Sequence, residues 1–294
     1  MKLTHNRAVW LMVAVTLMWS TAGVVTRHLE HAQKFEVTFW RSFFTMLCLL
    51  VILPLLKGRE VFSRMRHGGA ALWLSGLCWC GMFTFFMVAI MLTTVANVLV
   101  TMSLSPLLTA LMARVFIGHR IPLRTWLAIV VAGAGIAYMY ASQLGQGISL
   151  AGTLVALCVP IAGSANWTIN QYAQAHGKRI DLMPAVLVGA VLSSLVTLPL
   201  AWPFQASAHD LSLLFGLGLG QLAIPCILVV ACARVLKAPE VALLGLLEVI
   251  FGILLAWVGA GEVLGQDVLA GGTLVIGALV VNEMLGWRNN AVTR

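Results

Sequence analysis

Ten apolar stretches, each long enough to cross a lipid bilayer as a helix, constrain the fold more than any other feature. A helix needs roughly 20 apolar residues to cross the hydrocarbon core. We expect spans at approximately 8–26, 36–56, 70–91, 94–117, 122–142, 149–173, 182–202, 210–232, 239–260 and 267–287. The connections leave no room for a separate soluble domain, so the sequence predicts an all-α integral membrane protein with ten transmembrane helices.

The composition agrees with a membrane protein. Of the 294 residues, 61% are hydrophobic and 10% are charged, whereas soluble domains carry about 25% charged residues. The net charge of +8 lies mainly in the loops between spans, so it does not predict a nucleic-acid partner. The six cysteines lie in or beside apolar spans without a redox or zinc spacing, and we expect them to pack as small hydrophobic residues.

No motif for catalysis or cofactor binding is present in the sequence. HExxH, GxSxG, a Walker A loop and GxGxxG after a strand are all absent, and each of these patterns supports a particular chemistry. We therefore predict that the protein is not an enzyme, that it has no metal or other cofactor, and that ATP is not its energy source.

Lysine and arginine predict the orientation in the membrane, because cytoplasmic loops carry an excess of both. With both termini in the cytoplasm, fourteen of the 18 Lys and Arg residues fall on the cytoplasmic side, and Arg27 and Lys34 lie outside. The other two, Arg41 and Arg114, lie within spans. This asymmetry favours ten spans with both termini cytoplasmic.

The two halves of the chain resemble each other. The segment "SLSPLLTALMARVFIGHR" aligns with "LLEVIFGILLAWVGAGEV", which places Ser105 on Glu248 and Gly118 on Gly261. Each segment then leads into a glycine-rich span. A repeat of five helices has an odd number of spans, so its second copy is inverted in the membrane. We predict one repeat at 1–143 and an inverted repeat at 144–294, which is an arrangement typical of secondary transporters.

Several motifs resemble the EamA family of the drug/metabolite transporter superfamily. The segment "TTVANVLVTMSLSPLLTALMARVFIGHR" is similar to the family's fourth-helix signature, and "LLEVIFGILLAWVGAGEVL" to its second copy. "LMWSTAGVVTR" and "FWRSFF" are similar to the family's first and second helices. "NQYAQAHG", together with "WST", resembles the YddG-type amino-acid exporters. Val249 stands where the family has proline, and His119 stands where it has an acid.

The resemblance implies a secondary transporter that exports small metabolites by alternating access. It implies amino acids with apolar or aromatic side chains as substrates and the bacterial inner membrane as the location. An exporter of drugs or other metabolites is one alternative, and a passive uniporter or channel for the same solutes is another. The expected partners are a small-molecule substrate and membrane lipids. We expect a monomer, with a dimer as the alternative.

Polar residues recur at every fourth position of the fourth span, and therefore lie near one helix face. They are Thr93, Asn97, Thr101, Ser105 and Thr109. Pro106 removes a backbone hydrogen bond beside them. One hypothesis is a polar path with a hinge at Pro106. The alternative is packing between helices, in which Ser and Thr bond to their own backbone or to a neighbour.

Two charged residues lie within apolar spans. Glu248 lies eight residues from the cytoplasmic end of the ninth span, or roughly 12 Å along a helix. It could couple transport to protons, contact a substrate amine, or hold a structural hydrogen-bond network. Arg41 could extend to the membrane surface, pair with Glu36 or Glu262, or meet a substrate carboxylate. The sequence alone does not choose among these roles.

A substrate cavity between the repeats should draw on the polar, aromatic and methionine residues of the spans. The candidates are Trp19, Ser20, Trp79, Phe83, Asn97, Thr101, Met102, Ser105, Ser164, Trp167, Gln221 and Glu248. Candidate hinges are Pro106, Pro160 and Pro225. The aromatic residues have a simpler explanation as core or lipid contacts, and Trp167 as part of an interfacial belt.

Overall fold

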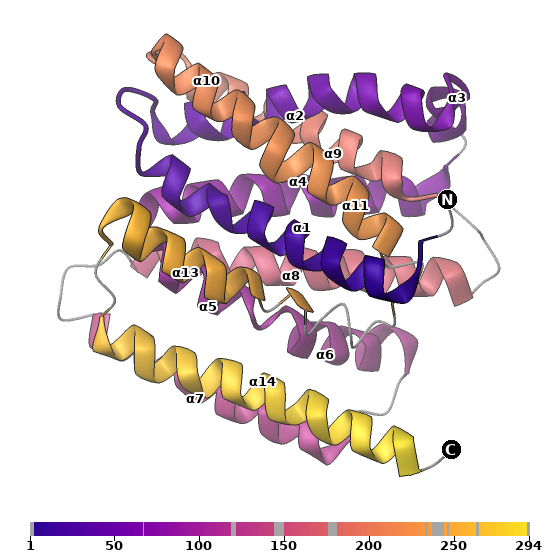
Figure 1. The fold of residues 1–294 in the computed structure, drawn as a ribbon, viewed down its shortest axis with the longest axis vertical. Coiled ribbons are helices and arrows are strands. Elements are labelled where there is room, and N and C mark those ends of the chain that lie inside the picture. Colours follow the sequence, from indigo (N-terminus) through magenta and orange to yellow (C-terminus); the bar gives the residue numbers. More distant parts are fainter. Residues whose placement is uncertain are drawn as a thin grey trace.

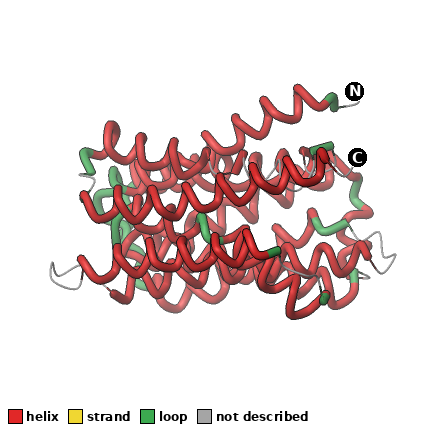
Figure 2. The backbone as a smooth tube through the Cα atoms, turned by 90° about the horizontal axis from the view of Figure 1, so that it is seen from below, coloured by secondary structure: helices red, strands yellow, loops and turns green. Residues whose placement is uncertain are grey.

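The computed structural model describes residues 3–66, 68–118, 122–143, 150–175, 181–232, 235–236, 244–245, 247–262 and 265–292. All regular secondary structure in these ranges is helical. The helices lie side by side in one bundle, and the two termini lie at the same end of it (Figures 1 and 2). We call this end the termini end, and the other the opposite end.

The helices follow the predicted spans within a few residues over most of the chain. Their bounds are α1 His5–Thr26, α2 Lys34–Lys57, α4 Gly69–Leu92, α5 Val95–Met102, α6 Ser105–Ile117, α7 Leu123–Gln143, α8 Leu150–Ala175, α9 Met183–Ala201, α10 Ala208–Gly216, α11 Ile224–Cys232, α13 Leu247–Ala260 and α14 Gln266–Val292. A π-helix, η1, covers Leu217–Ala223, and a short helix, α3, covers Glu60–Arg66. The sequence analysis did not predict α3.

Eight helical segments of the described chain are long and apolar enough to cross a membrane. Two further apolar helical segments, Leu123–Gly135 in α7 and Leu247–Ala260, are shorter. They coincide with the predicted fifth and ninth spans. The first part of the predicted ninth span lies outside the described residues, and so does any kink there. The structure is therefore that of a multi-pass membrane protein, and ten spans remain a prediction.

The fourth span is interrupted in its middle. α5 ends at Met102, a turn covers Ser103 and Leu104, and α6 begins at Ser105 with Pro106 in its first turn. Proline has no N–H to donate to the carbonyl four residues earlier, which here belongs to Met102. The Ser105 hydroxyl donates to that carbonyl instead, at 2.8 Å.

The eighth span contains the π-helix, and Pro225 provides a physical reason for it. Proline at this position cannot donate to the Gln221 carbonyl, and its ring would clash with that carbonyl in an α-helix. Widening of the preceding turn relieves the clash, and Ile224 N–H bonds to the Leu219 carbonyl, five residues back. Pro160 has a milder effect, since α8 continues through it without a break.

Several helix contacts recur when each helix is exchanged with the one five predicted spans away. Under this exchange α1 corresponds to α8, α2 to α9, α4 to α10–η1–α11, α5 and α6 to α13, and α7 to α14. The contact of α4 with α8 matches that of α1 with α11, and the contact of α4 with α9 matches that of α2 with η1. α7 packs mainly against α14, at the lower edge of Figure 1.

Two glycines that the sequence alignment places together end their helices in the same way. Gly118 follows α6 with φ 77°, and Gly261 follows α13 with φ 64°. A left-handed residue after a helix favours glycine, because a Cβ atom is strained there. The two helices therefore correspond in position and in how they end.

Candidate functional site

Arg41 lies in the interior of the bundle, with 1% of its side chain area exposed. Its Nη1 atom donates to Gln221 Oε1 at 3.0 Å, and its Nη2 atom donates to the Phe83 carbonyl at 2.8 Å. The guanidinium carbon lies 6.0 Å from the ring centroid of Phe83 and 5.7 Å from that of Phe86. The hypothesis that the Arg41 side chain extends to the membrane surface is therefore wrong.

The π-helix holds the main partner of Arg41. Gln221 is the fifth residue of η1, and its Nε2 atom donates to the Trp19 carbonyl of α1 at 3.4 Å. The Thr45 hydroxyl, one turn beyond Arg41, donates to the carbonyls of Arg41 and of Gly218. The side chain of Gln221 thus links α1 and α2 through a part of the eighth span whose backbone is irregular.

Cys226 lies near this group and near Glu248. Its buried thiol is beside Trp19 and close to both Arg41 and Glu248. We call Trp19, Arg41, Phe83, Gln221, Cys226 and Glu248 the central cluster. Its members come from α1, α2, α4, η1, α11 and α13.

Glu248 lies in the first turn of α13 and is partly buried. One turn later, Gly252 approaches Leu99 of α5 and Ser20 of α1. One turn earlier, Leu244 packs against a core group that includes Trp19. The face that carries Glu248 therefore points toward α1 and α5. Within the described residues its carboxylate has no hydrogen-bond or ion-pair partner.

The polar stripe of the fourth span is bonded largely within the protein. Asn97 Nδ2 donates to the hydroxyls of Thr93 and Thr153, at 3.0 and 2.9 Å. The Thr101 hydroxyl donates to the Asn97 carbonyl, and the Thr109 hydroxyl to the Ser105 carbonyl. These contacts match the packing alternative, in which the hydroxyls bond to backbone or to a neighbouring helix.

The broken middle of the fourth span contacts α8. The Ser164 hydroxyl donates to the Ser105 carbonyl at 3.0 Å, so these two candidates are neighbours. Met102 packs against the largest hydrophobic core group, and so does Met82. The structure thus places Asn97, Thr101, Ser105 and Ser164 along one line of contact between the fourth and sixth spans.

The other three candidates contact these groups less directly. Trp79 packs closely over Gly189 of α9, and its ring centroid lies 5.5 Å from that of Phe83, in the same hydrophobic group. Trp167 is 40% exposed on α8, which suits a membrane-facing position better than a cavity wall. The Ser20 hydroxyl donates to the Leu17 carbonyl of its own helix.

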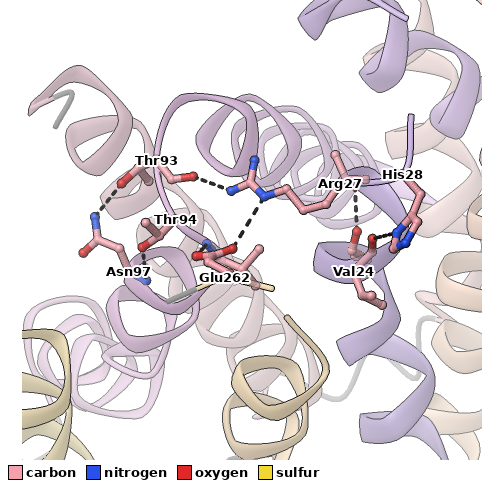
Figure 3. A network of polar contacts seen from close by, with 10 residues as sticks. Val24, Arg27, His28, Thr93, Thr94, Asn97 and Glu262 are labelled. Carbon is pink, nitrogen blue, oxygen red and sulfur yellow. Dashed lines mark hydrogen bonds and ion pairs between the residues drawn. The ribbon is translucent and has the colours of Figure 1, made fainter. Parts of the chain in front are cut away.

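Arg27 and Glu262 form an ion pair at the opposite end of the bundle (Figure 3). The distance from Arg27 Nε to Glu262 Oε2 is 3.5 Å. Arg27 also donates to the Thr93 carbonyl, and Glu262 Oε1 accepts from the Val95 N–H at the start of α5. Glu262 was one of two candidate acidic partners of Arg41, and it pairs with Arg27 instead.

The other expected partner of Arg41 is also engaged elsewhere. Glu36 is fully buried and accepts hydrogen bonds from the backbone N–H groups of Gln205 and Ala206, in the loop before α10, and from Trp40 Nε1. Asp210, in the first turn of α10, is equally buried. It accepts from the backbone N–H groups of residues 30–32, in the loop before α2. Each carboxylate therefore holds the loop that leads into the other's helix, and we call this arrangement the loop clamp.

The sequence analysis missed the loop clamp, the Arg27–Glu262 pair and Cys226. A local signal existed for Asp210, because "SAHD" at 207–210 has the spacing of a capping box, and the structure forms one. The structure also forms a capping box between Gln33 and Glu36. No local signal shows that each acid reaches a loop more than 160 residues away in sequence.

No metal centre is formed by the described residues, since no three of their His, Cys, Asp or Glu side chains gather closely enough. The fold and the buried polar groups define a multi-pass helical membrane protein with a polar cluster between its helices. One solved structure, titled "Crystal structure of protein", shares this fold with a TM-score of 0.61. It is 18% identical, and the alignment covers 96% of this chain and 98% of that one. No curated protein matches the chain.

Residues 6–141 match the model of the EamA-like transporter family. The matched residues are similar to an EamA-like transporter domain, and the helices α1 to α7 in this part of the chain carry Trp19, Arg41 and Phe83 of the central cluster. The match supports a membrane transporter over an enzyme.

Proposed function

We propose that the protein is a secondary transporter that exports amino acids with apolar or aromatic side chains across the bacterial inner membrane by alternating access. One observation carries this proposal, namely that the central cluster draws on helices from both halves of the chain. Its residues lie on α1, α2 and α4 of the first half and on η1, α11 and α13 of the second. Transporters built from inverted repeats bind substrate at such an interface, near the middle of the membrane.

The symmetric packing supports two inverted repeats as the moving parts. Exchange of each helix with its counterpart reproduces the main helix contacts, and Gly118 and Gly261 end corresponding helices alike. The break before Pro106 interrupts the fourth span, and the π-helix before Pro225 interrupts the eighth span beside Arg41. Interrupted helices leave backbone groups that can bond to a substrate or adjust during a conformational change.

Glu248 is the residue that we propose to couple transport to protons or to contact the substrate amine. Carboxylates within a membrane segment face partners, water or a transport pathway. Glu248 has no partner among the described residues, and its helix face points toward α1 and α5. These features favour a functional role over a structural hydrogen-bond network.

Flux measurements in proteoliposomes test the proposal. The purified protein would be reconstituted and supplied with a panel of amino acids and with cationic dyes, with and without a pH gradient. We expect aromatic and large apolar amino acids to move, and a pH gradient to drive them uphill. Movement of dyes alone would replace the amino-acid assignment by a drug exporter. Equal flux with and without the gradient would indicate a passive uniporter.

A further inference from the structure

Arg41 carries a charge that no described residue neutralises. Both of its hydrogen-bond acceptors, Gln221 Oε1 and the Phe83 carbonyl, are neutral groups. No Asp or Glu of the described chain lies within ion-pair distance, and Glu36 and Glu262 are bonded elsewhere. A buried charge without a counter-charge is unfavourable, and an apolar residue of similar size would pack at less cost. Stability alone therefore does not explain an arginine at this position.

The guanidinium also has unused hydrogen-bonding capacity. It has five N–H donors, and the structure forms two hydrogen bonds from them to the protein. The Nε atom is buried without any partner. A planar guanidinium with parallel free donors matches the two oxygens of a carboxylate better than any neutral acceptor. The missing partner of Arg41 therefore has the chemistry of a carboxylate.

Gln221, the side-chain partner of Arg41, lies where its amide group can move. Gln221 lies in the π-helix, where Pro225 has already removed a regular backbone hydrogen bond. Its second contact, to the Trp19 carbonyl, is long at 3.4 Å. Rotation of the amide away from Arg41 would break one hydrogen bond to a charged group and one weak bond. It would free the Nη1 donor, in addition to the Nε donor that already lacks a partner.

We propose that Arg41 and Gln221 form the site that binds the carboxylate group of the transported solute. The Gln221 amide oxygen holds the position that a substrate oxygen takes when the helices open, and its amide N–H can then donate to the same carboxylate. This site rests on the proposed export of amino acids and assigns one of their two charged groups. The face of α13 that carries Glu248 points toward α1, whose Trp19 carbonyl accepts from Gln221, so a zwitterion would meet opposite charges within one cluster.

Three related compounds separate the groups that the site would recognise. L-phenylalanine has both charged groups, L-phenylalaninamide lacks the carboxylate, and 3-phenylpropionate lacks the amine. In proteoliposomes of the wild-type protein, we expect L-phenylalanine to move at least tenfold faster than its amide. We expect Arg41→Gln to reduce phenylalanine flux at least tenfold and to leave the slow flux of the amide unchanged, which erases the preference.

Two further variants distinguish a binding role from a structural one. Gln221→Glu places a carboxylate against Arg41, so it should form an internal ion pair that occupies the site. We expect this variant to fold with an unchanged or higher Tm and to lose phenylalanine flux at least tenfold. Arg27→Gln is the matched control, because it removes an arginine of the opposite end that already has an acidic partner. It should keep the wild-type preference for phenylalanine over the amide.

The outcomes separate failure of the site from failure of the function. Equal wild-type flux of phenylalanine and its amide would overturn the carboxylate site and leave amino-acid export intact. Wild-type phenylalanine flux in a folded Gln221→Glu protein would also overturn it. If no compound moves, the Tm of the detergent-solubilised protein with 3-phenylpropionate decides the question. A rise in the wild type and none in Gln221→Glu supports the site alone, and no rise in either overturns both proposals.

Discussion

Two regions of the described chain hold charged groups inside the bundle and satisfy them very differently. At the opposite end, Glu36 and Asp210 each accept several hydrogen bonds, mostly from backbone N–H groups, and Arg27 pairs with Glu262. In the central cluster, Arg41 has only neutral partners, and Glu248 has none within the described part of the chain.

The difference shows where structure alone accounts for a charged residue. A carboxylate surrounded by backbone donors replaces the hydrogen bonds that water would provide, so its burial stabilises the loops around it. A charge without such partners destabilises the folded protein. The hydrogen-bonded carboxylates of the opposite end therefore stabilise the fold. The central cluster retains groups whose partners we assign to the transported solute and to protons.

The largest effect should come from the loop clamp. Asp210→Ala removes the buried carboxylate that accepts from the N–H groups of residues 30–32, and a hydrogen bond to a charged group contributes about 1.5–3 kcal/mol. We expect the variant to lose several kcal/mol of stability and to yield little folded protein. Thermal unfolding in detergent measures the change.

An exposed acid in the same loop is the control for Asp210. The exposed side chain of Glu30 lies 3.8 Å from His31, and its substitution keeps the backbone N–H that donates to Asp210. Glu30→Ala should therefore change stability by less than about 0.5 kcal/mol. A Tm for Asp210→Ala equal to that of Glu30→Ala would show that the loop clamp does not stabilise the protein.

Substitution of Glu248 should impair transport and leave stability unchanged, whereas substitution of Asp210 should reduce stability. Glu248→Gln keeps the shape of the side chain and removes its charge and its proton exchange. We expect flux to fall at least tenfold, which corresponds to about 1.4 kcal/mol in the barrier, with little change in Tm. Gradient-driven uptake into proteoliposomes, normalised to folded protein, is the measurement. Wild-type turnover by this variant would return Glu248 to the structural groups.

Substitution of either helix-ending glycine should reduce stability by a similar amount, which is smaller than the loss expected for Asp210→Ala. A non-glycine residue in the left-handed conformation costs about 1 kcal/mol, so Gly118→Ala and Gly261→Ala should each destabilise by this amount. No neighbouring atom lies near the added methyl group at either position, so a clash does not complicate the comparison. Clearly unequal losses in the unfolding free energy would weaken the correspondence between α6 and α13.

The Arg27–Glu262 pair should contribute least. Its side chains are 32% and 13% exposed, and partly exposed ion pairs contribute about 0.2–1 kcal/mol. A double-mutant cycle with Arg27→Gln and Glu262→Gln measures the coupling, since it cancels the separate effects of each change. A coupling energy above about 2 kcal/mol would place this pair with the loop clamp as a main support of the opposite end.

The positions of the helices follow from the sequence because hydrophobicity and chain breaking are local properties. Runs of apolar residues placed the described helices within a few residues, and Pro106 marked the break in the fourth span. The alignment of Gly118 with Gly261 likewise used only local pattern, and the structure gives both residues positive φ.

The partners of the charged residues depend on how the helices rotate and pack, which the local pattern does not specify. Arg41 lies 180 residues from Gln221, and Glu30 lies 180 residues from Asp210. The order of the predicted spans is compatible with an ion pair between Arg41 and either Glu36 or Glu262. The stripe on the fourth span crosses the break between α5 and α6, and its hydroxyls bond largely to the backbone.

The packing of α7 against α14 has a consequence for synthesis of the chain. Each of these helices is the last of its half, and α7 finds its main neighbour only when α14 has entered the membrane. At a synthesis rate of 5–20 residues per second, the interval between the two is on the order of 10 s. During that interval lipid or the insertion machinery must cover the face of α7 that α14 later occupies.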